Sequence, residues 1–402
     1  MVTLATERIV RPVEGMHLAI AAPWFAALGA AGKPVRVVHD VISRVVYGSI
    51  RIGAEVVGVG LDTRVAADSS SADSALAFVN GLWGDALGRH EPRLGSSMSV
   101  RDARGALIPL GPEITEAFSE ATGRLVVFVH GLINTERSWT GTGAGPGLID
   151  SVEDHPDLTP VAIRYNTGRA VATNGAQLAS LLEVVHAAWP QPVQSIALVG
   201  HSMGGLVIRS ACAAALHAGH RWIGDVSDVV TIGSPHGGAP LERFVNAAAF
   251  GLSAAPQTRP LAEFLNTRSR GIKDLRAGSI GYTSDDDPSN TTQLGGWCES
   301  SRGGSPHRQS GAYGGASEPE QAIHTSLLGH IRHRFVGGVI TSNPTHPIGG
   351  VVGDLMVRPA SSTRVPRVQP ADVVVVGGVN HFSLLRKPAV VNQVMVWLAP
   401  PP

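Results

Sequence analysis

The sequence predicts an α/β fold in which a mostly parallel sheet is flanked by helices. Short, continuous apolar runs, typical of strands buried on both faces, recur from about residue 96 onward. Stretches of helical character lie between several of them, as in βαβ units. The expected strands are Leu125–Val129, Pro160–Tyr165, Ser195–Val199, Asp228–Ile232, Ile331–Ile340 and Val373–Val376, and the clearest expected helices are Ala176–Ala188 and Leu206–Ala218.

The composition fits one large globular domain with additions. The chain has 402 residues, of which 43% are hydrophobic and 16% charged, with 32 basic and 32 acidic side chains. Because the charges balance and form no runs, we expect neither a nucleic-acid partner nor polybasic attraction to an anionic membrane. Cys212 and Cys298 define no disulfide framework, so we expect two free thiols in a reducing compartment.

Residues 1–95 are expected to form an N-terminal helical extension. Val37–Gly60 has apolar residues near helical spacing, with charges among them that argue against a membrane span. We expect a helix packed on the main domain; a cap or an interfacial helix that meets a lipid-like substrate is the alternative. Leu18–Ala31 has the length of a signal peptide, but Pro23 interrupts it. A cytoplasmic protein is therefore expected, with peripheral membrane contact and export left open.

Residues 96–402 are expected to form the main domain. A hairpin is predicted around the turn Asp102–Gly105 at its start. Residues 241–330 are predicted to be a lid and a flexible insertion. The first part, 241–282, has a mostly helical pattern, whereas Thr283–Pro319 is polar and predicts a surface loop.

The segment Gly200-His-Ser202-Met-Gly204 predicts a nucleophile. It directly follows the strand Ser195–Val199 and precedes a helix that we expect to start near Gly205. A strand–turn–helix of this kind is a nucleophile elbow, in which small residues let the serine hydroxyl protrude. The helix N-terminus also directs N–H groups and partial positive charge toward the reacting centre. A glycine-rich turn with an idle serine is the alternative.

His381 is the expected base. A serine hydroxyl needs a base, and in this strand–turn–helix context the chain order is serine, acid, histidine. His381 lies on the loop after the last expected strand, where a base is required. The competing histidines have local explanations in turns or strands: His130, His201, His236, His324, His330 and His333.

Asp354 is the expected acid, because it follows the strand Ile331–Ile340 and precedes His381. Asp372 is the main rival, but it begins the last strand and should lie at the opposite end of the sheet. Two other candidates, Asp225 and Asp228, should also lie at the opposite end of the sheet from Ser202. The last three, Asp285, Asp286 and Asp287, fall in the polar insertion.

Two backbone N–H groups are expected to hold the negative charge that develops during acyl transfer. One is that of Met203, the residue after the nucleophile, and the other that of Leu132, after His130-Gly131. Gly131 would let the backbone approach the reacting centre.

No metal or cofactor is expected. The chain has no HExxH motif and no Cys/His cluster with ligand spacing, and His324–His333 fits a polar strand entrance. No glycine pattern for a nucleotide follows a strand.

Several motifs resemble those of bacterial lipases and esterases with an α/β-hydrolase fold. They are Leu125–Gly131, Val199–Val207 and Thr231–Gly238, and they look most like the group related to the GPI inositol-deacylase domain and triacylglycerol lipases. The resemblance covers about residues 98–398. It implies an α/β-hydrolase fold and cofactor-free hydrolysis of carboxylic esters, often lipid-like.

Within this resemblance, Gly353-Asp354 followed by Val357 is similar to the acid motif, and Asn380-His381 to the base motif. Leu355-Met356 departs from the group, which often has glycine there. Polyhydroxyalkanoate synthases look related in fold but carry cysteine at the elbow, so Ser202 favours hydrolysis.

We therefore expect a serine esterase or lipase that acts through a Ser–Asp–His triad and an acyl-enzyme intermediate. Its substrate would be a small-molecule or lipid ester. Two alternatives stay open: an acyltransferase that uses the same triad, and a non-catalytic lipid-binding protein on a hydrolase scaffold. The sequence specifies neither acyl chain length nor oligomeric state.

Overall fold

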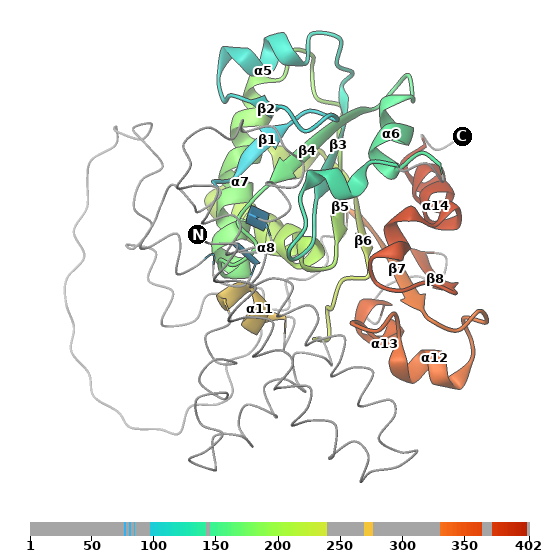
Figure 1. Cartoon of the computed structure of the whole chain (residues 1–402). Coiled ribbons are helices and arrows are strands. Elements are labelled where there is room, and N and C mark those ends of the chain that lie inside the picture. Colours follow the sequence, from blue (N-terminus) through green and yellow to red (C-terminus); the bar gives the residue numbers. More distant parts are fainter. Residues whose placement is uncertain are drawn as a thin grey trace, which may run out of the picture.

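A mixed sheet of eight strands forms the centre of the computed structural model, within the residues that it describes. These residues are 76–77, 80–81, 84, 97–141, 145–238, 269–275, 330–363 and 372–399. The strand order is β2-β1-β4-β3-β5-β6-β7-β8 (Figure 1). The strands are β1 Ser99–Arg101, β2 Leu107–Ile108, β3 Arg124–Val129, β4 Thr159–Arg164, β5 Ser195–His201, β6 Val226–Ile232, β7 Arg332–Val339 and β8 Val373–Gly377.

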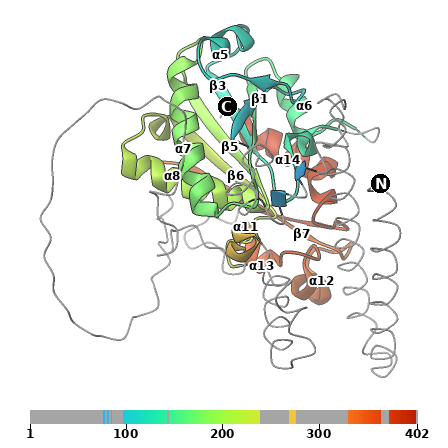
Figure 2. The same cartoon turned by 60° about the vertical axis from the view of Figure 1, so that its left-hand side comes forward.

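Helices cover both faces of this sheet (Figure 1 and Figure 2), which confirms the predicted α/β architecture. The helices are α5 Pro112–Ala117, α6 Leu148–Glu153, α7 Val171–Ala188, α8 Met203–Ala218, α11 Arg270–Asp274, α12 Pro347–Val352, α13 Pro359–Thr363 and α14 Pro388–Leu398, and the short 3-10 turns are η2 Glu136–Trp139, η3 Trp222–Asp225 and η6 Ser383–Arg386.

The predicted hairpin forms one edge of the sheet. β1 pairs antiparallel with β2 and with β4, whereas β4, β3, β5, β6, β7 and β8 pair in parallel. Asp102 stabilises the turn, because its Oδ1 accepts hydrogen bonds from the N–H groups of Arg104 at 2.9 Å and Ala106 at 2.8 Å. Gly105 closes the turn at φ 87°, a conformation that favours glycine.

Side chains of β3 alternate between two hydrophobic clusters, one on each face of the sheet. Leu125, Val127 and Val129 join the cluster that includes buried residues of α7 and α8. Val126 and Phe128 join the cluster that includes buried residues of α6 and α14. Because helices cover both faces, every position of β3 from Leu125 to Val129 is apolar and buried, which explains the continuous run in the sequence.

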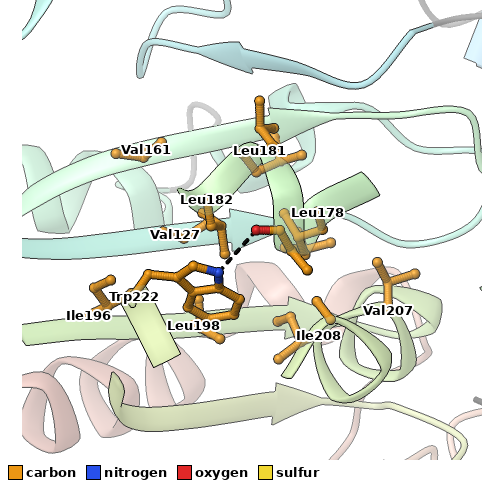
Figure 3. Packing of buried hydrophobic residues seen from close by; sticks show 14 of the residues in the cluster. Val127, Val161, Leu178, Leu181, Leu182, Ile196, Leu198, Val207, Ile208 and Trp222 are labelled. Carbon is orange, nitrogen blue, oxygen red and sulfur yellow. Dashed lines mark hydrogen bonds between the residues drawn. The ribbon is translucent and has the colours of Figure 1, made fainter. Parts of the chain in front are cut away.

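Trp222 fills the space between the sheet and α7 (Figure 3). It is fully buried, and its Nε1–H donates a hydrogen bond to the carbonyl oxygen of Ala179 at 3.0 Å. The indole therefore packs in the core without leaving its one polar group unpaired.

Both long helices start earlier than the sequence pattern predicts. α7 begins at Val171 rather than Ala176, and the N–H of Val171 donates to Asp274 Oδ2 of α11 at 2.7 Å. α8 begins at Met203, directly after Ser202, rather than near Gly205. The helix N-terminus is thus closer to the serine than predicted.

The predicted N-terminal extension and lid fall mostly outside the described residues. Between residues 1 and 95, only positions 76, 77, 80, 81 and 84 are described, and they are helical. Val37–Gly60 and Leu18–Ala31 lie outside the described part, as do Thr283–Pro319 and most of 241–282 apart from the α11 region. The proposed division at residue 95 stays a prediction.

Cys212 is a free, buried thiol, and Cys298 lies outside the described residues. Among the helices that the structure describes, none combines the length and apolar character needed to cross a membrane.

Candidate active site

Ser202 occupies a strained turn between β5 and α8. Its backbone adopts φ 52° and ψ −120°, an unfavourable conformation for a residue with a Cβ atom. The N–H of Ser202 donates to the carbonyl oxygen of Ile232 in β6 at 2.9 Å. The predicted elbow geometry is therefore present, and strain of this kind is typical of functional positions.

The glycines around Ser202 are required by close backbone contacts. A Cβ atom at Gly200 would lie 2.7 Å from the nitrogen of Gly205. A Cβ atom at Gly204 would lie 2.1 Å from the carbonyl oxygen of Val129, and one at Gly205 would lie 2.2 Å from Ser234 Oγ. These glycines let α8 approach β3 and β6, so that the helix begins directly beneath the serine.

His381 connects the serine to a carboxylate. Its Nε2 lies 2.8 Å from Ser202 Oγ, and its Nδ1 lies 2.7 Å from Asp354 Oδ2. All three side chains are buried. An imidazole that donates its Nδ1–H to the carboxylate can accept the serine proton at Nε2. The structure thus brings together the three side chains that the sequence motifs indicate.

Asp354 is oriented by its own loop, which follows β7 and α12. Its Oδ1 accepts hydrogen bonds from the N–H groups of Met356 at 3.0 Å and Val357 at 2.8 Å. Its carbonyl oxygen accepts the N–H of His381 at 2.9 Å. Because backbone N–H groups hold Oδ1, Oδ2 is free to face the imidazole. Asp354 thus fixes His381 through both its carbonyl oxygen and its side chain.

The predicted oxyanion donors lie beside the serine. A Cβ atom at Gly131 would be 3.0 Å from Ser202 Cβ, so the loop after β3 packs directly on the elbow. Met203 is the first residue of α8, where an N–H has no acceptor within the helix. Among the hydrogen bonds of the described residues, none uses the N–H of Leu132 or of Met203. Their function as oxyanion donors stays a prediction.

Comparison with known proteins bears on the fold of the chain. Residues 120–259 match the family model of the PGAP1-like alpha/beta domain. The described domain has the α/β-hydrolase fold. No curated protein matches the chain.

Solved structures similar to this chain include bacterial lipases and esterases. The mature form of a Bacillus licheniformis lipase is 18% identical with a TM-score of 0.42, covering 68% of this chain and 91% of that chain. A metagenomic carboxyl esterase is 14% identical with a TM-score of 0.36, covering 69% and 76% of the two chains. Naproxen esterase from Bacillus subtilis is 14% identical with a TM-score of 0.33, covering 69% and 84%.

The rival acids of this α/β-hydrolase domain bind other side chains. Asp372 directly precedes β8, and its Oδ1 lies 3.7 Å from Arg334 Nε. Asp228 pairs with Arg332 through Oδ2 at 2.8 Å. Asp225 binds His186 at 2.7 Å, and residues 285–287 lie outside the described part of the chain. In the described ranges, no group of three or more His, Cys, Asp or Glu side chains is arranged to hold a metal ion.

Two buried histidines beside the triad are structural. His201 Nε2 lies 3.2 Å from the carbonyl oxygen of His381, and because a carbonyl only accepts, this nitrogen carries the proton. Burial lowers the pKa of His201 well below its usual value. His130 binds the carbonyl oxygen of Gly131 through Nδ1 and stacks on Tyr165, and burial lowers its pKa to about 4. Both histidines therefore stay neutral and hold the loops around the serine.

His236 links α8 to the loop after β6. Arg209 Nη1 donates to its Nδ1 at 3.1 Å, so Nε2 carries the proton and donates to Thr231 Oγ1 at 3.0 Å. Burial, followed by the charge of Arg209, lowers the pKa of His236 to about 3. Its ring packs edge-on against Phe335. The Ser234-Pro-His236 motif therefore ties α8, the helix that follows the elbow, to β6.

The sequence did not indicate two further strained residues, or the residues that pack against them. Ile133, directly after Leu132, adopts φ 59°, and Leu355, directly after Asp354, adopts φ 83°. Leu355 takes the left-handed conformation at a position where the resemblance described above leads us to expect glycine. Gly81 contacts Ile133 from the N-terminal segment, and no local pattern in the sequence indicates that contact.

Proposed function

We propose that this protein hydrolyses carboxylic esters, with Ser202 as nucleophile, His381 as general base and Asp354 as the acid that orients the base. The observation that carries the proposal is the pair of short hydrogen bonds that joins these side chains at 2.8 Å and 2.7 Å. The family match supports it as well, since residues 120–259 contain Ser202 and the loop after β3.

In this mechanism, Ser202 Oγ attacks the ester carbonyl carbon while His381 Nε2 takes its proton. The carbonyl oxygen becomes an oxyanion, which the N–H groups of Leu132 and Met203 stabilise. The C–O bond to the leaving alcohol then breaks, and His381 gives its proton to the alcohol oxygen. Water, deprotonated by His381, attacks the acyl-enzyme and releases the carboxylic acid and free Ser202.

We propose lipid-like esters as the substrate class. Apolar side chains are exposed on the loops that carry the acid and the base: Leu355 is 57% exposed and Phe382 48%. On the neighbouring α12, Ile348 and Val351 are also exposed. An apolar rim of this kind favours contact with an acyl chain or a lipid surface over a charged substrate.

The test of the nucleophile is labelling with a fluorophosphonate probe, together with hydrolysis of p-nitrophenyl esters of increasing chain length. We expect wild type to label and to hydrolyse some of these esters, and Ser202→Ala to lose both. Ser180→Ala is the matched control, because Ser180 is exposed on α7 and should leave both readouts unchanged. Folded wild-type protein that neither labels nor hydrolyses would contradict the proposal and favour a non-catalytic scaffold.

The acid is tested with the pair Asp354→Asn and Asp372→Asn. An asparagine at position 354 no longer offers a carboxylate to His381 Nδ1–H and disfavours the required tautomer. We expect kcat to fall by about 10⁴-fold, the loss known for such a change in a serine hydrolase triad. Asp372→Asn should keep near wild-type activity, and the reverse result would move the acid to Asp372.

A further inference from the structure

Ile133 is held in an unfavourable conformation one residue after the predicted oxyanion donor Leu132. Its φ of 59° is rare for a β-branched residue, because the branched side chain crowds the backbone in the left-handed region. Such a conformation costs on the order of 1–3 kcal/mol and persists only where the surroundings enforce it. The groups that contact Ile133 therefore hold the peptide that joins Leu132 to Ile133, which is adjacent to the peptide that carries the Leu132 N–H.

Gly81 packs closely against Ile133. A Cβ atom at Gly81 would lie 2.4 Å from Ile133 Cγ2 and 3.3 Å from the Ile133 nitrogen, so only glycine fits. Gly81 is itself anchored, because its carbonyl oxygen accepts a hydrogen bond from Ser269 Oγ at 2.6 Å. Ser269 is fully buried and caps α11.

The same N-terminal segment rests on the loop after β4. Asn166 Nδ2 donates to the carbonyl oxygen of Gly84 at 3.0 Å. A Cβ atom at Gly168 would lie 2.1 Å from the carbonyl oxygen of Asn80, so the two backbones touch. The loop after β4 and the N-terminal segment thus pack together next to the loop after β3, which carries Leu132 and Ile133.

Thr167, in the loop after β4, also contacts Ile133. Its Oγ1 accepts a hydrogen bond from the N–H of Ile133 at 3.3 Å, and its side chain is buried. Ile133 is therefore fixed through its side chain by Gly81 and through its N–H by Thr167.

We infer that Gly81 and Thr167 are positioning residues for the oxyanion hole, acting through Ile133 on the N–H of Leu132. The inference rests on the proposed function and gives part of the N-terminal extension a role in the active site. Residues separated by more than 80 positions in the sequence would then set the transition-state contacts of the hydrolase domain.

The first experiment compares Thr167→Val with Thr167→Ser. Valine keeps the shape of threonine but removes the acceptor, whereas serine keeps the hydroxyl. We expect Thr167→Val to lower kcat about tenfold or more with little change in KM, because a displaced donor weakens only transition-state binding. The inhibition constant of phenylboronic acid should rise by a similar factor, since its tetrahedral adduct with Ser202 places an oxygen in the hole. Thr167→Ser should keep kcat and the inhibition constant near the wild-type values.

The second experiment uses Gly81→Ala, with Gly224→Ala as the matched control. A Cβ atom at Gly224 would meet nothing within 4 Å, so that variant should behave like wild type. Gly81→Ala should lower kcat further than Thr167→Val. In an Ile133→Gly background, which removes the clashing Cγ2, Gly81→Ala should have little additional effect.

The outcomes separate this inference from the proposed function. Wild type that neither labels nor hydrolyses esters overturns both. Active wild type whose Thr167→Val variant matches Thr167→Ser in kcat and in boronic-acid inhibition overturns the inference alone. If Gly81→Ala does not fold, the Thr167 pair still decides. The pH profile of kcat should be unchanged in every active variant, because neither residue contacts His381 or Asp354.

Discussion

Leu355 adopts φ 83° on the loop that orients Asp354, and more than half of its side chain is exposed. A left-handed conformation costs an L-residue about 1–2 kcal/mol, whereas glycine adopts it freely but loses about 0.5–1 kcal/mol of extra chain entropy on folding. Because little apolar burial is lost at this exposed position, we expect Leu355→Gly to stabilise the protein by up to about 1 kcal/mol. Urea unfolding measures the change in the free energy of unfolding.

Leu216→Gly is the control for this prediction. Leu216 is similarly exposed but lies within the right-handed helix α8. The same substitution there should destabilise the protein by about 1 kcal/mol, since glycine disfavours a helix interior. A loss of stability in both variants would mean that Leu355 makes contacts that outweigh its backbone strain.

The sequence predicts those residues of the candidate site that lie in a recognisable local motif. Ser202 lies in a motif of five residues that the elbow geometry requires, and His381 follows a clear strand. Asp354 required elimination of rivals, which the ion pairs of Asp228 and Asp372 support. Gly81 and Thr167 gave no such signal, because their significance lies in contacts with Ile133 across long stretches of chain.

The elbow depends on how closely α8 approaches the sheet. A Cβ atom at Gly204 would lie 2.1 Å from the carbonyl oxygen of Val129 at the end of β3, and backbone cannot move aside like a flexible side chain. We expect Gly204→Ala to shift α8, to destabilise the protein by roughly 1–3 kcal/mol as overpacking does, and to abolish fluorophosphonate labelling. Thermal unfolding and labelling are measured together.

Gly350→Ala provides the contrast, because Gly350 lies in α12 with open space around its Cα. Alanine favours a helix over glycine by about 1 kcal/mol, so this variant should be slightly more stable and should still label. Normal labelling of Gly204→Ala would show that the helix tolerates displacement from β3.

Strands were easier to predict than the starts of helices. Parallel strands covered on both faces are continuous apolar runs, so β3, β5 and β8 stand out in the sequence. The first five residues of α7 include Thr173, Asn174 and Gly175, which have low helix propensity. This part of the helix forms because Asp274 of α11 accepts the N–H of Val171, a contact 103 residues away that no local pattern reveals.

Across the whole molecule, the parallel sheet brings the functional loops to one end. The loop after β3, the elbow after β5, the acid loop after β7 and the base loop after β8 all follow the carboxyl ends of neighbouring strands. Several buried histidines of the described domain are neutral, and one of them, His201, joins the elbow to the base loop. The stability of the domain should therefore depend on keeping those histidines unprotonated.

Four described histidines have lowered pKa values because of burial: His201 well below its usual value, His130 and His333 to about 4, and His236 to about 3. An unfolded histidine takes up its proton near pH 6.5, so below that pH the unfolded chain binds more protons than the folded one. Stability must then fall as the pH falls from 6.5 toward 4, by about 1.4 kcal/mol per pH unit for each such histidine.

We expect His236→Asn, which removes the group between Arg209 and Thr231, to reduce the slope of unfolding free energy against pH by the contribution of about one proton. Urea unfolding at a series of pH values measures this slope. His217→Asn, an exposed position on α8, should keep the wild-type slope, and equal slopes in both variants would mean that His236 becomes protonated in the folded protein.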